Sequence, residues 1–370
     1  MAKLSPRMRQ LAAISVAVDA QIPIMFLGPP GTGKTQSMYA IGRAKNRPVY
    51  TVITSLREPT DLNGLPYQWD GTVKIAPPLW AQLAQANKGI VFFDECTWAA
   101  PRVQAAMLRL VNEKMCGELA MPDVSFVLAG NPVGESGGGY EISGPLANRL
   151  LHMTWENDES AWIEGMMNGW PDPAIPLINP DWRDHLHEAR VMLATYIKSA
   201  TQRLLITPEN ESQWSQAWPS PRSWDMVAQL DAACTASGIN GEVQGELFRG
   251  AVGTGPALEY ITWRKDLDMP DPEIFLANPE AFTLPKRRDK AFVVLTSVAS
   301  AVTRRLTVAR WNAGWAIMAK AAEQGAIDSA GAAAKQLALN RPKGAMAPKE
   351  AAIFLPLFEA AGLFDLKGGK

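Results

Sequence analysis

Hydrophobic residues in the first 155 positions form short continuous runs that amphipathic stretches separate. Such runs predict buried strands, because the strands of a parallel sheet are covered on both faces. The stretches between them repeat apolar positions at helical spacing, as Val103, Met107 and Leu110 do after Pro101. This alternation predicts an α/β domain with a doubly wound parallel sheet over residues 1–155. The expected strands lie at 24–27, 48–54, 88–95, 124–130 and 150–155, and the expected helices before Pro101 lie at 6–20, 34–45 and 78–87.

The pattern changes after Trp155. Residues 156–265 carry helical periodicity with few strand-like runs, which predicts a second, helical domain. The stretch from Asp266 to Pro285 is rich in proline and acidic residues and is interpreted as a linker or as a loop that lies over the surface. Helical patterns return after it. Residues 266–370 are therefore expected to form a linker and a helical C-terminal extension.

Tryptophan is concentrated in the helical part of the chain. Seven of the 13 tryptophans lie between Trp155 and Trp224. Exposed aromatic side chains often dominate partner surfaces, so this concentration is compatible with a docking site. Packing inside the helical domain and between subunits is the favoured interpretation, because large aromatic residues are mostly buried.

A glycine-rich octapeptide, Gly28-Pro-Pro-Gly-Thr-Gly-Lys34-Thr35, follows the first predicted strand and precedes a predicted helix. Strand, glycine turn and helix in this order are the context of a phosphate-binding loop. Glycines let backbone N–H groups approach a polyphosphate, and the helix N-terminus adds positive potential. Lys34 would reach the β- and γ-phosphates, and the Thr35 hydroxyl would bind Mg²⁺. The predicted nucleotide-binding residues are Gly28, Pro29, Pro30, Gly31, Thr32, Gly33, Lys34, Thr35 and Gln36.

Two carboxylates end the predicted strand at 88–95. Asp94 would hold Mg²⁺, which prefers oxygen ligands, and Glu95 would act as general base on the attacking water. Side chains at the carboxyl ends of parallel strands commonly form active sites. Two solvated acids at a strand end are the alternative, and the intact phosphate-binding loop makes that alternative the weaker one.

Two further polar residues lie at the ends of predicted strands, one after a strand and one before a strand. Asn131 ends the strand at 124–130 and could bind the γ-phosphate or position the water, although an Asn-Pro pair also shapes turns. Arg149 directly precedes the run at 150–155 and could stabilise charge on a neighbouring subunit's nucleotide. An isolated arginine would otherwise simply be solvated.

The order of these motifs resembles an AAA+ ATPase, and within that superfamily it is most similar to the MoxR-like branch. The resemblance covers about residues 5–265. After Glu95 the chain reads Cys96-Thr97-Trp98, where this branch usually has Ile-Asn-Arg. The motifs that carry the resemblance are the phosphate-binding loop, Phe92-Phe93-Asp94-Glu95, Ala129-Gly130-Asn131-Pro132, Gly144-Pro-Leu-Ala-Asn-Arg149 and Ser220-Pro-Arg222.

The resemblance implies roles, cofactors and partners. Asn131 is similar to the sensor-one residue, and Arg149 to an arginine finger acting in trans. Arg222 resembles a sensor-two arginine on a helical lid (156–265) that reads the γ-phosphate in cis. The implied activity is hydrolysis of ATP with Mg²⁺ by a homo-oligomeric ring, a hexamer, that remodels or activates a protein client or a von Willebrand-A-type partner.

Composition agrees with a cytoplasmic protein. The three cysteines have no paired spacing, which favours a reducing compartment, and neither a signal peptide nor a bilayer-spanning run is expected. The 36 basic and 37 acidic residues leave a net charge of −1. This charge makes nucleic acid the less favoured partner without excluding it. A nucleic-acid motor of restriction or phage type and a metal-chelatase motor remain the alternative functions. A non-hydrolysing switch is disfavoured because both Asp94 and Glu95 are present.

Overall fold

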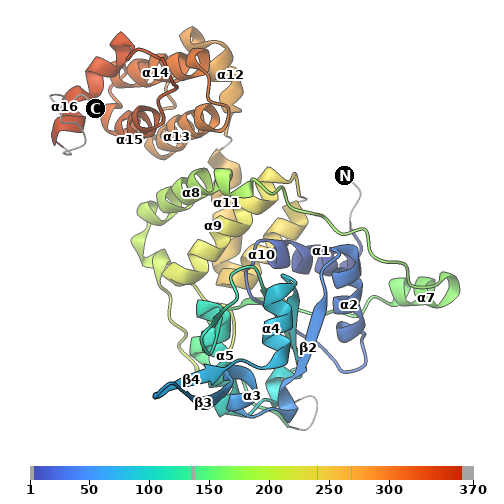
Figure 1. Cartoon of the computed structure of the whole chain (residues 1–370). Helices are drawn as coiled ribbons and strands as arrows, with labels where there is room; N and C mark the ends of the chain where they lie inside the picture. The colour runs from blue at the N-terminus through green and yellow to red at the C-terminus, as the bar shows by residue number, and fades with distance from the viewer. Residues whose placement is uncertain (1–3, 135–137, 240, 268, 361–370) are drawn as a thin grey trace. The chain divides into compact units, whose positions relative to one another are not determined.

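The computed structural model describes residues 4–134, 138–239, 241–267 and 269–360 (Figure 1). These residues divide into two compact units. The sheet unit takes in the chain up to Trp182 together with Gln202–Glu259. The helical unit takes in Arg183–Thr201 and the chain from Tyr260 onward.

A five-stranded parallel sheet forms the centre of the sheet unit, with strand order β2-β5-β8-β1-β9. The predicted parallel sheet and its strands are confirmed. Leu27 at the end of β1 pairs with Gly130 on one side and Thr154 on the other, so the carboxyl ends of these strands meet at one edge. The strands are β1 (Ile24–Leu27), β2 (Val49–Ile53), β5 (Ile90–Asp94), β8 (Ser125–Gly130) and β9 (Leu151–Thr154).

Helices cover both faces of the sheet, and two short antiparallel ribbons lie outside it. The first ribbon turns at Asp70-Gly71, where both residues have the positive φ that two-residue hairpin turns favour. The helices are α1 (Pro6–Asp19), α2 (Lys34–Ala44), α3 (Pro59–Asn63), α4 (Leu79–Ala86), α5 (Pro101–Glu113), α6 (Gly144–Ala147), α7 (Glu159–Asn168), α9 (Pro221–Ala236) and α10 (Gly241–Val252). The ribbons are β3 (Leu65–Trp69) with β4 (Thr72–Ala76), and β6 (Met115–Cys116) with β7 (Leu119–Ala120).

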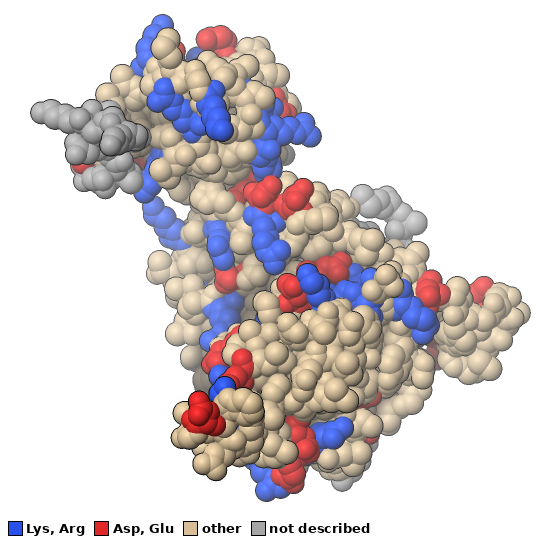
Figure 2. All heavy atoms as spheres, in the orientation of Figure 1, with Lys and Arg blue, Asp and Glu red and all other residues tan. Residues whose placement is uncertain are grey.

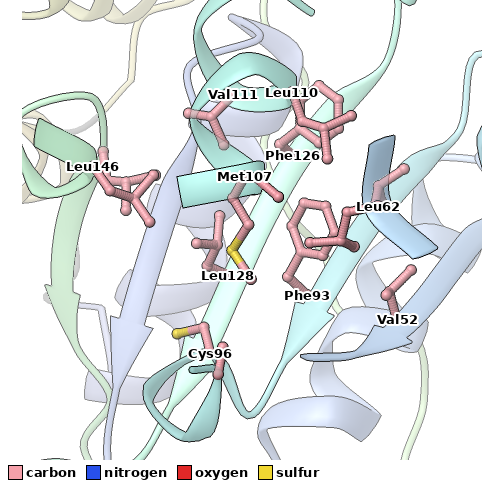
Figure 3. Packing of buried hydrophobic residues seen from close by; sticks show 14 of the residues in the cluster. Val52, Leu62, Phe93, Cys96, Met107, Leu110, Val111, Phe126, Leu128 and Leu146 are labelled. Carbon is pink, nitrogen blue, oxygen red and sulfur yellow. The ribbon is translucent and has the colours of Figure 1, made fainter. Parts of the chain in front are cut away.

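The core of the sheet unit follows the alternation of side chains along each strand. Phe93 and Phe126 stack on one face, where Met107 and Leu110 of α5 pack with them (Figure 3). Phe92, the neighbour of Phe93, turns to the opposite face and stacks on Phe26 of β1. Both faces of the central strands are therefore apolar, which is why β5 and β8 read as continuous hydrophobic runs.

The helical unit has its own core. Trp311 and Trp315 of α14 pack edge to face, and Phe354 lies against Trp315. Its helices are α8 (Leu186–Ser199), α12 (Pro272–Ala277), α13 (Arg288–Arg304), α14 (Val308–Glu323), α15 (Ile327–Leu339) and α16 (Leu355–Ala360); α11 (Thr254–Leu267) begins in the sheet unit and ends in the helical unit. Short 3-10 turns lie at Thr54–Leu56, Cys96–Trp98, Trp182–His185, Thr201–Leu204, Glu211–Gln213, Pro279–Ala281 and Lys349–Phe354.

Two sequence-based expectations meet a different arrangement in these units. The region 156–265, expected as one helical lid, places α9 and α10 in the sheet unit and α8 in the helical unit. The expected linker at 266–285 contains α12 and buries Leu276 and Phe282 in the helical core. Its Asp271-Pro272 pair, which also suits a loop, here caps and starts a helix. Residues 361–370 of the expected extension lie outside the described residues.

No helix in the described part of the chain has the length and apolarity needed to cross a membrane.

Candidate functional site

The loop between β1 and α2 has a conformation that its glycines permit. Gly31 and Gly33 have φ of +76° and +80°, in the left-handed region that residues with a Cβ avoid. A Cβ at Gly28 would lie 2.5 Å from the carbonyl oxygen of Trp155. The first N–H groups of a helix have no acceptor within it, and Gly33, the N-cap of α2, has no side chain to bind them. The loop is therefore suited to an anion with several oxygens.

Lys34 is buried and links this loop to the end of β8. Its Nζ donates hydrogen bonds to the carbonyl oxygens of Gly28 and Pro29, at 2.7 and 2.8 Å, and to Oδ1 of Asn131, at 2.9 Å. Burial lowers the pKa of Lys34, and the nearby negative charge of Asp94 opposes that shift. The ammonium group is thus held at the mouth of the loop by neutral acceptors.

Thr35 links the loop to the end of β5. Its hydroxyl donates a 2.7 Å hydrogen bond to Oδ2 of Asp94. The Asp94 carbonyl in turn accepts a 2.8 Å bond from the Thr54 hydroxyl, which follows β2. A hydroxyl and a carboxylate side by side form the oxygen donor set that Mg²⁺ prefers, so these two residues fit the ion.

Glu95 has an unusual backbone conformation at the end of β5. Its φ is +56°, a region that costs a residue with a side chain about 1–2 kcal/mol. The Glu95 N–H donates to Oδ1 of Asp94 at 2.9 Å, and the exposed carboxylate accepts a hydrogen bond from the Ser55 hydroxyl. The turn therefore presents Glu95 beside the loop.

These side chains surround one cavity of about 410 Å³. Gly28 and Pro29 do not line it, but their carbonyls hold Lys34. The lining residues are Pro30, Gly31, Thr32, Gly33, Lys34, Thr35, Gln36, Asp94, Glu95, Gly130 and Asn131. A larger hollow of about 710 Å³ lies among β9, α10 and the segment before α9, lined by Arg9, Arg249, Glu156 and Glu246 among others. Because that hollow lacks the N-terminal turn of α2, the smaller cavity is the candidate phosphate site.

The two predicted arginines lie together, and neither lines this cavity. Arg149 donates from Nε to Oδ1 of Asn112 at 3.1 Å and from Nη1 to the Pro145 carbonyl at 2.5 Å. Arg222, in the first turn of α9, donates to Oδ1 of Asn148 at 3.1 Å. Burial first, and then the charge of Arg222, lower the pKa of Arg149, which agrees with the closeness of the two groups. The contact of Arg222 with its own chain's nucleotide stays a prediction.

Three residues support the site through contacts that the sequence did not predict. Ser55 holds Glu95, Thr97 accepts a 3.2 Å bond from the backbone N–H of Asn131, and Trp155 donates from Nε1 to the Thr32 carbonyl at 3.3 Å. Ser55 lies in the short turn that follows β2, and Trp155 directly follows β9. Their position at the carboxyl edge of the sheet was the signal available for finding them.

The match to one family model agrees with this geometry. Residues 23–150 match the family model described as AAA domain (dynein-related subfamily), a range that contains the predicted site residues except Arg222. A solved structure named a "putative ATPase", from Cytophaga hutchinsonii ATCC 33406, is 14% identical, covers 67% of this chain and 82% of its own, and has a TM-score of 0.41. No curated protein matches this chain. Together, the parallel sheet, the phosphate-binding loop and the family match show that the first part of this chain is a P-loop AAA domain, which a helical region follows.

Proposed function

We propose that this protein is an AAA+ ATPase that binds ATP with Mg²⁺ and hydrolyses it to ADP and phosphate. One observation carries the proposal. The bonds Lys34–Asn131 and Thr35–Asp94 bring the ends of β1, β5 and β8 around a single cavity at a helix N-terminus. A buried lysine, a hydroxyl–carboxylate pair and a second, adjacent carboxylate are the groups that phosphoryl transfer to water requires.

Each residue has a role that follows from its position. Lys34 and the loop N–H groups would bind the phosphates, while Thr35 and Asp94 would hold Mg²⁺. The ion, when bound, would neutralise charge on the phosphate oxygens. Glu95 would accept a proton from the attacking water, with Ser55 fixing the direction of its carboxylate. Asn131, whose amide already contacts Lys34, would orient the water or the γ-phosphate.

The arginines support a shared site. Arg149 and Arg222 lie together at a place outside the cavity of their own chain, so we propose that Arg149 acts on the nucleotide of a neighbouring subunit. A ring of six subunits would use every site in this way.

The biological role that we propose is remodelling of a protein client, as in the MoxR-like branch. Nucleotide-dependent movement would pass to the client through exposed loops. The ribbon of β3 and β4 supports this, because Leu65, Trp69 and Val73 are all exposed on it. The residues 114–122, which hold β6 and β7, are the second candidate contact.

The ATPase proposal is tested with two variants and a matched control. Lys34→Ala should lose affinity for a fluorescent ATP analogue by about 10²-fold, because a charge-assisted contact disappears. Glu95→Gln should keep that affinity and lose about 10²-fold or more of phosphate release. Glu323→Gln removes an exposed acid in the helical unit and should change neither quantity. Unchanged ATP affinity in Lys34→Ala would refute the site.

A further inference from the structure

The segment that contains α7 exposes an apolar surface. Met167 is 76% exposed and Trp162 is 55% exposed. In Figure 1 the helix stands away from the sheet, and Figure 2 shows its surface as largely uncharged. The exposed apolar residues are Trp162, Ile163, Met166, Met167 and Trp170. A cluster of this kind on a soluble protein marks a surface that another molecule covers.

The α7 segment is fixed at the side of the molecule that carries α2, the helix that begins at Lys34. The guanidinium of Arg7 lies 5.3 Å from the Trp170 ring and donates a 3.3 Å bond to the Ser37 hydroxyl of α2. Asp172, after α7, pairs with Arg43 of α2 at 2.8 Å. These contacts hold the α7 segment against α2, whose N-terminus carries the phosphate-binding loop of the same chain.

A second apolar patch lies beside the two arginines. The backbone N–H of Ile206 donates a 3.1 Å bond to the carbonyl of Pro219, which directly precedes the N-cap of α9 and so places Ile206 close to Arg222. Trp214 packs on Gly144, where α6 begins and leads to Arg149. We name this surface the 204–214 patch. Its exposed apolar residues are Leu204, Leu205, Ile206 and Trp214.

Charge around the two surfaces is complementary. Of the six acidic side chains in residues 156–182, Glu156 and Asp172 pair with Arg9 and Arg43, while Glu159 and Glu164 are exposed on α7 itself. Among the described residues, Arg149 and Arg222 bind only the neutral groups of Asn112, Pro145 and Asn148. The 204–214 patch also carries Glu209 and Glu211, so the positive charge is confined to its arginine side. Opposite charge at the two surfaces favours their encounter and their register.

We propose that the apolar surface of α7 is covered by the 204–214 patch of a second copy of this chain, in a head-to-tail contact. The proposal rests on the proposed shared ATP site and names the surface that forms it. One surface adjoins α2, the helix that the phosphate-binding loop precedes, and the other adjoins Arg149. A single repeated contact therefore covers both apolar patches and carries Arg149 toward the neighbour's nucleotide. A head-to-tail contact repeats from copy to copy and can close into a ring.

Crosslinking tests the contact directly. Met167→Cys and Ile206→Cys are made in separate chains, mixed with Mg²⁺–ATP and treated with a short flexible bismaleimide. The native Cys96, Cys116 and Cys234 are buried and should not react. We expect a crosslinked dimer in the mixture and in neither variant alone. Leu79→Cys, exposed on α4, replaces Met167→Cys in a control mixture that should give no dimer.

Assembly gives the second readout. Met167→Asp should weaken self-association by about tenfold or more in light scattering, because it places a charge in an apolar contact. Leu79→Asp should associate like wild type. The proposal is overturned if Met167→Asp assembles normally, if Met167→Cys crosslinks to itself, or if the mixture gives no dimer. It is also overturned if wild-type chains stay monomeric while α7 binds phospholipid vesicles.

The failure of this proposal can be separated from the failure of the proposed function. Met167 lies outside the ATP cavity, so Met167→Asp should bind the fluorescent ATP analogue like wild type. Absent crosslinks combined with trans-acting Arg149 would refute the α7 contact and leave the shared site standing. Loss of ATP binding in wild-type protein would refute the function itself.

Discussion

Lys34 carries its charge in a place where little water reaches it. Three neutral oxygen acceptors replace that water, and burial lowers the pKa of the side chain. An ammonium group placed in this way gains most when phosphate oxygens arrive, because its interactions are then charge-assisted. The loop motif predicts a lysine at this position. It does not predict the hydrogen bond of Lys34 to Asn131, which lies 97 positions away in the sequence.

Ser55 belongs to none of the sequence motifs. Its hydroxyl binds the Glu95 carboxylate, and Glu95 itself lies in a strained left-handed conformation. Ser55→Ala should lower kcat about tenfold with ATP affinity unchanged, since the base loses its orientation and the phosphate contacts stay intact. Single-turnover phosphate release and analogue binding measure the two quantities. Ser55→Thr, which keeps a hydroxyl, should restore most of kcat; equal kcat in all three proteins would contradict the positioning role.

The phosphate-binding loop and β9 are coupled as elements through a close backbone approach. Gly28→Ala would place a Cβ against the Trp155 carbonyl, whereas Gly31→Ala meets open space and only the strain of positive φ. Gly28→Ala should therefore cost about 2–3 kcal/mol in free energy of unfolding and Gly31→Ala about 1 kcal/mol. Urea denaturation followed by tryptophan fluorescence measures both. An equal loss in the two variants would show that the contact with Trp155 does not limit the loop.

Strand β9 also carries a group that links stability to pH. His152 donates from Nε2 to the Ala147 carbonyl at 2.8 Å, and burial lowers the pKa of His152. When the pH falls below about 6.5, the ordinary pKa of histidine, His152 therefore binds a proton more readily in the unfolded chain than in the folded chain. The free energy of unfolding should be unaffected by His152 above that pH and should fall as the pH drops through it toward the folded pKa. His152→Gln should reduce this fall between about pH 7 and 5; an unchanged pH dependence would refute the assignment.

Across the whole molecule, the proposed catalytic groups of one chain do not all lie around one cavity. The cavity contains the phosphate-binding loop, Asp94, Glu95 and Asn131, while Arg149 lies elsewhere. Arg149→Ala should keep ATP affinity and lose about 10²-fold or more of turnover. Mixing it with Lys34→Ala should restore part of the activity, because one chain supplies the arginine and the other the intact loop. Activity that stays at the level of the separate variants would argue against a shared site.

The sequence by itself determined the features that depend on local backbone chemistry. Glycines in Gly28–Thr35 specify the loop, continuous apolar runs specify buried parallel strands, and strand ends place Asp94 and Asn131 at one edge of the sheet. These follow from short-range rules of conformation and from the geometry of a parallel sheet.

Only the tertiary structure decided which distant groups meet. It placed Ser55 on Glu95 and Arg222 beside Arg149, and it moved α8 into the unit formed by the chain after Tyr260. It also divided the tryptophans, burying Trp155 and Trp224 and exposing Trp162, Trp170 and Trp214. The physical reason is that composition marks a side chain as apolar, while the path of the whole chain determines whether that side chain is covered from within or left for another molecule.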